Sequence, residues 1–190
     1  MINQYVVEKT LGIGSFAVVK LCRDVNTGLQ YAIKQMNKKM LMTKVLHGNV
    51  TAYESVIEEL KVLKMLNHPN VIWLNEVIDD PKKDKLYVVT EWLTKGSLGE
   101  ALEKRNEGRT TKIGLPITKV REYLRDILKA LHYCHNTAKV FHRDIKPENI
   151  MINHNNEAIL IDFGVSSLRG DDDFIHTKMG TLLFFAPEMF

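Results

Sequence analysis

The sequence has few cysteines and no strong excess of charge of either sign. Only Cys22 and Cys134 occur, far apart and without C-x-x-C spacing, which excludes a disulfide framework and a cysteine-based zinc site. The formal net charge is +3, too small to predict a nucleic-acid partner from charge alone. With 45% hydrophobic and 26% charged residues among 190, the composition is typical of a globular chain with a core of its own.

Long apolar runs are also missing. No segment approaches the roughly 18 apolar residues of a membrane span, and Glu8 and Lys9 stand where a signal peptide would need an apolar run. Internal repeats and low-complexity segments are absent as well. These features predict no membrane partner and a cytoplasmic location, with the nucleus as the alternative.

What the sequence does contain is a short loop, residues 141–149, rich in side chains suited to chemistry. Asp144 is a carboxylate that can accept a proton, and Lys146 can neutralise negative charge that develops nearby. Asn149 offers a neutral oxygen, and Asp162 follows thirteen residues later on a second turn. Such an oxygen pair suits Mg²⁺, which takes few protein ligands and shares phosphate oxygens. One base, one cation and two metal ligands are the groups that phosphoryl transfer requires.

The pattern His142-Arg143-Asp144-x-Lys146-Pro147-x-Asn149, followed by Asp162-Phe163-Gly164, resembles that of the protein kinases. The resemblance implies an α+β fold, with a small antiparallel β lobe carrying one helix and an incomplete helical large lobe. It implies ATP and Mg²⁺ as cofactors, and transfer of the γ-phosphate to a protein substrate. Two features resemble the motifs of serine/threonine kinases rather than those of tyrosine kinases. They are Lys146 and the pair Gly180-Thr181 ahead of Ala186-Pro187-Glu188.

The expected organisation is one incomplete kinase domain over residues 1–190. The small lobe covers 1–90, the hinge 91–96 and the partial large lobe 97–190, which ends after the activation segment. Alternation and β-branched residues predict strands, and apolar positions at the 3.6-residue period predict helices. The strands are expected at 5–11, 17–23, 30–36, 71–78, 85–90, 150–152 and 158–161, and the helices at 51–66, 97–105 and 116–135. Residues 37–50 are expected to form a polar linker whose charges are solvated.

A glycine loop, Gly12-Ile13-Gly14-Ser15-Phe16-Ala17, separates the first two strands. Ala17 stands at the third glycine of G-x-G-x-x-G, and a β-branched strand follows, whereas the Rossmann motif needs a helix there. A plain hairpin turn is the other interpretation. The resemblance favours a loop that covers the phosphates. It implies a nucleotide site formed by Leu11, Gly12, Gly14, Ser15, Phe16, Ala17, Val19, Ala32, Lys34, Thr90, Glu91, Leu93 and Met151.

The same resemblance gives roles to the candidate catalytic residues. Lys34 would hold the α- and β-phosphates, although a lysine on a strand is more often simply solvated. Glu54, Glu58 and Glu59 are all candidates to pair with it, and alignment on Asn67-His68-Pro69-Asn70 selects Glu59. Within the main chain of the hinge, Glu91 and Leu93 would bond the adenine edge, and Thr90 would be the gatekeeper. Asp144 would accept the proton of the substrate hydroxyl, Lys146 would neutralise the γ-phosphate, and Asn149 and Asp162 would hold Mg²⁺.

Arg143, Thr177 and Thr181 are the candidate regulatory residues. A phosphate on the activation segment could pair with Arg143 and order that segment. Thr177 is the candidate phosphosite, which implies an upstream activating kinase.

Within the family, the chain most resembles the calcium/calmodulin-dependent protein kinase kinases. The similarity lies in residues 77–81, 86–89, 142–149 and 162–166. The Arg/Pro-rich insert of that subfamily is absent, and so is a calmodulin-binding tail, so calmodulin is not an implied partner.

The sequence departs from the family near its end. Leu182 and Phe184 replace the usual proline and tyrosine before Ala186, and the chain stops at Phe190, where the family continues with further helices. Exposed apolar surface is therefore expected on the helix at 116–135 and at 182–185. Two functions stay open: a serine/threonine kinase, or a non-catalytic nucleotide-binding or interaction module.

Overall fold

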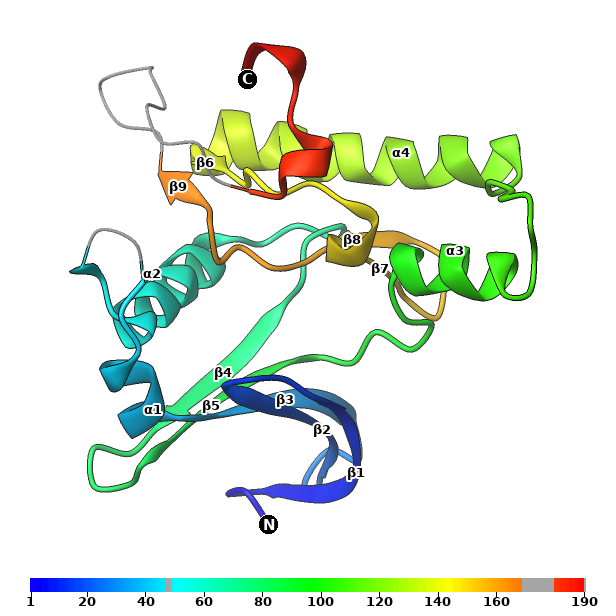
Figure 1. The fold of residues 1–190 in the computed structure, drawn as a ribbon. Helices are drawn as coiled ribbons and strands as arrows, with labels where there is room; N and C mark the ends of the chain where they lie inside the picture. The colour runs from blue at the N-terminus through cyan, green and yellow to red at the C-terminus, as the bar shows by residue number, and fades with distance from the viewer. Residues whose placement is uncertain (47–48, 169–179, 190) are drawn as a thin grey trace. The chain divides into compact units, whose positions relative to one another are not determined.

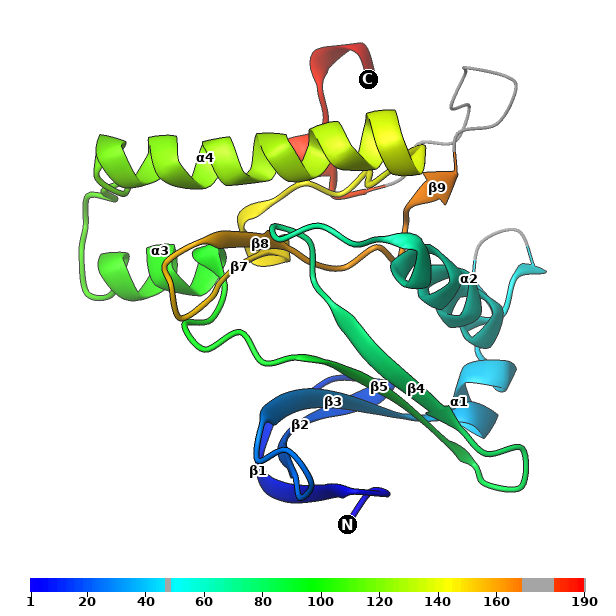
Figure 2. The same cartoon turned by 180° about the vertical axis from the view of Figure 1, so that it is seen from behind.

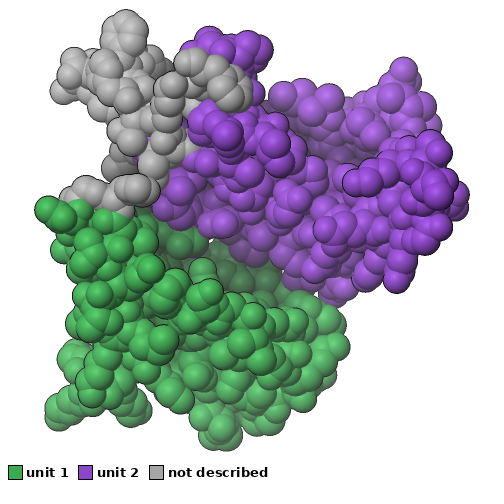
Figure 3. Space-filling model, viewed as in Figure 1, with its two compact units in different colours: residues 1–61, 73–92 green, residues 62–72, 93–190 purple. Residues whose placement is uncertain are grey.

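The computed structural model describes residues 1–46, 49–168 and 180–189. The chain divides into two compact units, one formed by residues 1–61 and 73–92 and the other by residues 62–72 and 93–190 (Figure 3). In the part of the chain that is described, no helix is long and apolar enough to cross a membrane.

The first unit contains a five-stranded antiparallel sheet in the order β1-β2-β3-β5-β4 (Figures 1 and 2). All five strands that the alternation predicts in this region are present. Their bounds are β1 Tyr5–Ile13, β2 Ala17–Asp24, β3 Gln30–Asn37, β4 Leu74–Asp79 and β5 Lys85–Glu91.

Alternate residues of these strands build the core of the first unit. Tyr5, Cys22, Ile33 and Val89 are completely buried, and Tyr31 packs edge-on against Tyr5 with 5.7 Å between ring centroids. Because side chains of a strand point alternately to opposite faces, the residues between them lie on the other face of the sheet. Because Cys22 is completely buried, it is part of this core.

The segment predicted as a solvated linker instead contains a helix, α1, Lys38–Thr43. Asn37 caps it, with its side-chain oxygen accepting the Met40 N–H at 3.2 Å. Lys38 is buried, and its Nζ donates to Asp79 Oδ1 and to the Asp80 main-chain oxygen, both at 2.8 Å. The prediction of solvated charges is wrong for Lys38, because its partners come from the distant β4–β5 turn.

The predicted helix at 51–66 is observed as α2, Ala52–Met65. Thr51 begins it with a capping box: its main-chain N–H donates to Glu54 Oε2 at 2.7 Å, and its hydroxyl accepts the Glu54 N–H at 3.2 Å. This local pattern in the sequence is enough to locate the start of the helix.

The second unit is formed by helices and short strand pairs (Figure 1). Its elements are α3 Leu98–Asn106, α4 Ile117–His132, β6 Val140–Phe141, β7 Ile150–Ile152, β8 Ala158–Leu160 and β9 Ser167–Leu168. The β7–β8 hairpin contacts α4 through β8 and α3 through β7. A π-helical segment, Tyr133–Ala138, extends α4 and ends at Lys139, which has a left-handed backbone.

Helix α4 has a buried apolar side and an exposed one. Ile127 and Ala130 are buried, whereas Leu124 and Leu128 are each more than half exposed. Leu183, in the 3-10 helical turn Leu182–Phe184, is also exposed. The exposed apolar surface predicted for these two regions is therefore present.

Candidate catalytic site

The loop after β6 is anchored by His142, which is almost completely buried. Its Nε2 lies 2.9 Å from the Ile161 main-chain oxygen, and its Nδ1 accepts the Asp144 N–H at 3.2 Å. This arrangement requires the neutral ring with its proton on Nε2. The ring also packs edge-on against Phe163, 4.7 Å between centroids. His142 thereby joins the loop that carries Asp144 to the turn that carries Asp162.

Burial lowers the pKa of His142, and the charge of Lys146 acts in the same direction. The hydrogen bond to Ile161 and the nearby carboxylates of Asp162 and Asp144 raise the pKa, but by less. The neutral ring is thus the stable form at neutral pH.

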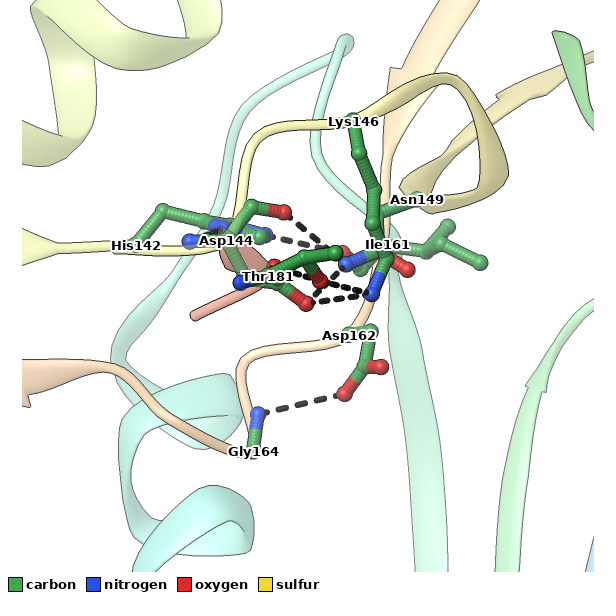
Figure 4. Close-up of polar contacts among 8 residues, drawn as sticks. All are labelled: His142, Asp144, Lys146, Asn149, Ile161, Asp162, Gly164 and Thr181. Carbon is green, nitrogen blue, oxygen red and sulfur yellow. Dashed lines mark hydrogen bonds and ion pairs between the residues drawn. The ribbon is translucent and has the colours of Figure 1, made fainter. Parts of the chain in front are cut away.

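The carboxylate of Asp144 is the centre of a polar cluster (Figure 4). Its Oδ1 accepts two hydrogen bonds from Thr181, from the N–H at 2.9 Å and from the hydroxyl at 2.7 Å. Its Oδ2 lies 2.7 Å from Lys146 Nζ, which also donates to the Thr181 hydroxyl oxygen at 2.8 Å. Asn149 Nδ2 donates to Oδ2 at 3.0 Å and to the Asp144 main-chain oxygen at 2.9 Å. These bonds fix the carboxylate in one orientation.

The same contacts set the charge of Asp144. Burial raises the pKa of its carboxyl group, but the hydrogen bonds from Lys146 and Thr181 and the charge of Lys146 lower it by more. The net pKa lies below the ordinary value, so Asp144 is ionised at neutral pH. An ionised, oriented carboxylate can accept a hydrogen bond from a hydroxyl and take up its proton.

Thr181 reaches Asp144 because Gly180 precedes it. Gly180 has φ +112°, and a Cβ built there would lie 2.3 Å from the Arg143 main-chain oxygen. Only glycine fits this close approach, which brings a segment 37 residues away in sequence onto the loop that carries Asp144.

Asn149 and Asp162 present oxygens that fit a hard cation. Both hydrogen bonds of the Asn149 amide use its nitrogen, so Oδ1 is the atom that it can offer to a metal. Asp162 is exposed, has φ +63°, and uses Oδ1 to accept the Gly164 N–H at 3.3 Å. Among the described residues, no group of three or more His, Cys, Asp or Glu side chains is arranged for a metal. An amide oxygen and a carboxylate oxygen are ligands that suit Mg²⁺, which completes its shell with water and phosphate oxygens.

In the first unit, the register places four candidate nucleotide residues on one face of the sheet. Val19 lies opposite Lys34, and Ala32 lies opposite Thr90. Ala32 and Lys34 are two residues apart on β3, so all four side chains project to the same side. The Thr90 hydroxyl donates to the Ala32 main-chain oxygen at 3.4 Å. The Gly14 N–H donates to the Ala17 main-chain oxygen at 2.8 Å and closes the glycine loop.

The other predicted residues are placed less specifically. Lys34 and Glu59 both belong to the first unit, and both side chains are half-buried. Phe16, near the tip of the glycine loop, lies 5.9 Å from Lys44 Nζ. In the second unit, Leu93 is buried and Met151 is half-buried. The remaining loop residues, Leu11, Gly12 and Ser15, are exposed.

Arg143 contacts the segment after Gly164. Its Nε donates to the Val165 main-chain oxygen at 2.6 Å, and its NH2 nitrogen donates to the Ser166 main-chain oxygen at 3.4 Å. Thr177, the predicted phosphosite, lies outside the described residues. Its relation to Arg143 stays a prediction.

Sequence reasoning assigned Thr181 only a regulatory role, whereas the structure places its hydroxyl between Asp144 and Lys146. It gave no role to His142 beyond the motif. The glycine directly before Thr181 was the available signal, because glycine is the residue that permits a close backbone approach.

Comparisons with known proteins agree with the motifs. Residues 5–190 match the family described as protein kinase domain. A probable serine/threonine-protein kinase of Dictyostelium discoideum is 37% identical over 190 residues, which cover 100% of this chain and 26% of that protein. CBL-interacting protein kinase 32 of Oryza sativa subsp. japonica is 35% identical, over 99% of this chain and 40% of the relative.

Serine/threonine-protein kinase GRIK2 of Arabidopsis thaliana is 37% identical, over 98% of this chain and 44% of its own length. The chain thus spans between about a quarter and less than half of the length of these relatives. The α+β fold with a small antiparallel lobe, predicted from the motifs, is confirmed. The chain belongs to the protein kinase domain family.

Proposed function

We propose that this protein transfers the γ-phosphate of ATP to serine or threonine hydroxyls of protein substrates. The observation that carries the proposal is the cluster in which Asp144 is held by Lys146, Asn149 and Thr181. It combines an ionised acceptor with a cation, because Lys146 Nζ lies 2.7 Å from Asp144 Oδ2. Such positioning and charge stabilisation supply most of the catalysis in phosphoryl transfer.

In the proposed reaction, Asp144 accepts a hydrogen bond from the substrate hydroxyl and so points its oxygen at the γ-phosphorus. A new O–P bond forms, the bond from the γ-phosphorus to the bridging oxygen of ADP breaks, and the hydroxyl proton passes to Asp144 late in the transfer. Lys146 balances the negative charge on the transferred group. Bound Mg²⁺, for which Asn149 and Asp162 are the proposed ligands, would supply further neutralisation of phosphate charge.

The first unit would hold the nucleotide. Lys34 would bind the α- and β-phosphates with Glu59 as its partner, and Val19 and Ala32 would contact the adenine. Their positions on one face of the sheet support this proposal. The main chain at Glu91 and Leu93 would bond the adenine edge, next to Thr90.

The test is phosphate transfer by the full chain from ATP to a peptide library with serine or threonine at a fixed position. Asp144→Asn removes the proton acceptor but keeps the size of the side chain, so we expect nucleotide binding to be retained and transfer to fall at least about a hundredfold. Asp84→Asn, which affects only an exposed ion pair with Lys39, is the matched control and should transfer at the wild-type rate.

Equal transfer by the wild type and Asp144→Asn would reject the assignment of Asp144. Nucleotide binding without any transfer by the wild type would instead favour the non-catalytic module. The presence of every catalytic side chain that the motifs require supports catalysis over that alternative.

The finer classification is also a proposal. Residues 77–81, 86–89, 142–149 and 162–166 support a place near the calcium/calmodulin-dependent protein kinase kinases. We expect no binding to immobilised calmodulin with or without calcium, and calcium-dependent retention would contradict this. An upstream kinase acting at Thr177 and a cytoplasmic or nuclear location complete the proposal. Phosphosite mapping and cell fractionation would test them.

A further inference from the structure

The exposed side of α4 borders a groove in the second unit. The groove has a volume of about 810 Å³, and its lining comes from α4, from the π-helical segment after it and from the loop that contains His68. A site of this size can hold several side chains of a ligand or partner. Its lining residues are not among the candidate catalytic or nucleotide-binding residues, so the groove requires an explanation of its own.

Two rows of side chains run along the part of α4 that lines the groove. Arg121, Arg125 and Lys129 are four positions apart and are all exposed. Leu124 and Leu128, which are 54% and 56% exposed, follow the first two basic residues by three positions. Because residues three and four apart are neighbours on a helix, the basic row lies directly beside the apolar row. The groove thus offers an apolar contact with a positively charged border.

The acidic residues of this part of α4 have partners elsewhere. Glu122 pairs with Lys119 at 2.6 Å, and Asp126 Oδ2 accepts the Ala158 N–H at 3.1 Å. The described residues that line the groove include no carboxylate. The groove is therefore positively charged, and an anionic partner would be attracted to it.

Part of the wall of the groove is formed by His68 and Tyr133, whose rings stack with 5.2 Å between centroids. Hydrogen bonds hold both rings: the Tyr133 hydroxyl accepts the Asn67 N–H at 2.9 Å, and His68 Nδ1 accepts the Asn70 N–H at 3.0 Å. Burial lowers the pKa of His68, and the charge of Lys129 acts in the same direction, so the ring is neutral at neutral pH. A wall that is already ordered costs little to arrange when a partner binds.

The two rows match an amphipathic helix with an acidic row. Apolar residues at positions i and i+4 of such a helix have the same spacing as Leu124 and Leu128. A second copy of this chain, bound through the same face, would bring two basic rows together, and like charges across an interface are unfavourable. A membrane presents a broad, flat surface, whereas these leucines line a groove.

We propose that the groove along α4 is a docking site for an acidic amphipathic helix of a partner protein. Apolar residues one turn apart on that helix would pack against Leu124 and Leu128. Three acidic residues, four positions apart, would pair with Arg121, Arg125 and Lys129. The docking site is separate from the groups proposed for phosphate transfer, so the inference does not depend on that reaction.

The test measures binding of a synthetic peptide to the full chain by fluorescence anisotropy. The peptide has about 18 residues, a length at which a helix can form in water, with glutamate at three positions four apart and leucine at two positions beside them. We expect this acidic peptide to bind and its Kd to rise with salt concentration. A peptide with lysine at the three glutamate positions should bind at least about tenfold more weakly.

Changes in the protein test the two rows separately. Arg125→Glu should raise the Kd of the acidic peptide at least about fivefold, because an attraction becomes a repulsion. A peptide with lysine in place of the central glutamate should recover affinity for this variant, since the central position faces Arg125 in either direction of the helix. Leu128→Ala should raise the Kd about tenfold through lost apolar contact. Lys104→Glu, at an exposed position of α3 outside the groove, is the matched control and should leave the Kd unchanged.

Failure of the acidic peptide to bind the wild type, or an equal Kd for the wild type and Arg125→Glu, would overturn the proposal. Binding to vesicles of phosphatidylserine and phosphatidylcholine in place of the peptide would also overturn it and assign the groove to a membrane. A dimer that forms through this face in place of peptide binding would overturn it in favour of a second copy. Phosphate transfer to the peptide library should be equal in Arg125→Glu and the wild type, so this test and that of the proposed function can fail separately.

Discussion

The α-carbon of Gly180 lies directly against the main-chain oxygen of Arg143, so that any Cβ at this position would be 2.3 Å from that oxygen. The contact joins the activation segment to the residue beside Asp144. It explains how a threonine far along the chain becomes part of the cluster around that carboxylate.

Gly180→Ala adds only one methyl group, but it should lower kcat strongly. The methyl group would push Thr181 away from Asp144, and we expect kcat to fall at least about tenfold, the cost of about 1.4 kcal/mol in the barrier. Gly114→Ala is the control, because its Cβ meets no atom within 4 Å. Wild-type turnover in Gly180→Ala, measured in the peptide assay, would contradict the structural account of this contact.

Thr181→Val should remove the hydroxyl that Asp144 and Lys146 share, while keeping the shape of the side chain. The Thr181 bonds lower the pKa of Asp144, so losing the hydroxyl should raise that pKa and move the acidic limb of the kcat–pH profile to higher pH. Thr181→Ser keeps the hydroxyl and should keep the wild-type profile. The measurement is kcat against pH for all three proteins, and an unshifted acidic limb in Thr181→Val would argue against the shared hydroxyl.

Lys38 and Lys39 are adjacent lysines in different environments, and they allow a matched comparison of stability. The side chain of Lys38 is 10% exposed and pairs with Asp79, whereas that of Lys39 is 75% exposed and pairs with Asp84. Lys38→Ala would remove a largely buried side chain together with its bonds to Asp79 Oδ1 and to the Asp80 main-chain oxygen, whereas the exposed pair of Lys39 with Asp84 contributes little. Thermal melting should show a clear fall in Tm for Lys38→Ala and almost none for Lys39→Ala. Equal changes in Tm for the two variants would show that the burial of Lys38 does not contribute to stability.

His142 should make stability depend on pH. Burial lowers its pKa in the folded chain, so the unfolded chain binds this proton more readily, with a pKa of about 6.5. The contribution of the neutral ring is complete above that pH and is lost as the pH falls below it. Protonation also converts the Nδ1 acceptor for the Asp144 N–H into a donor.

The comparison is with His142→Phe, which cannot titrate. As the pH is lowered from 7.5 to 5.0, the Tm of the wild type should fall more steeply than that of the variant. Parallel curves for the two proteins would mean that protonation of His142 has no effect on folding.

Features with a local physical cause could be predicted from the sequence. The alternation at Val18 to Arg23 and the 3.6-residue period of residues 51–66 are local patterns, and β2 and α2 formed where these patterns predicted them. The positions of Asp144 and Asn149 in one loop likewise follow from adjacency in the chain.

Contacts between distant segments could not be predicted in the same way. The burial of Lys38, at the start of α1, depends on Asp79 at the end of β4, and the bonds of Thr181 to Asp144 join residues that are 37 positions apart in the chain. Helix and strand propensities and the hydrophobic period predict which face of an element a residue occupies. They do not predict which atom of a distant segment will contact that residue.

Arg143 and Asp162 both have left-handed backbones, with φ values of +65° and +63°. This conformation costs an L-residue about 1–2 kcal/mol and costs glycine almost nothing. Selection for thermal stability alone would therefore favour glycine at Asp162, whereas selection for phosphate transfer would retain the carboxylate. Directed evolution of this protein under heat, without an activity screen, should accumulate loss-of-function changes at this turn early, and a parallel selection that requires turnover should not.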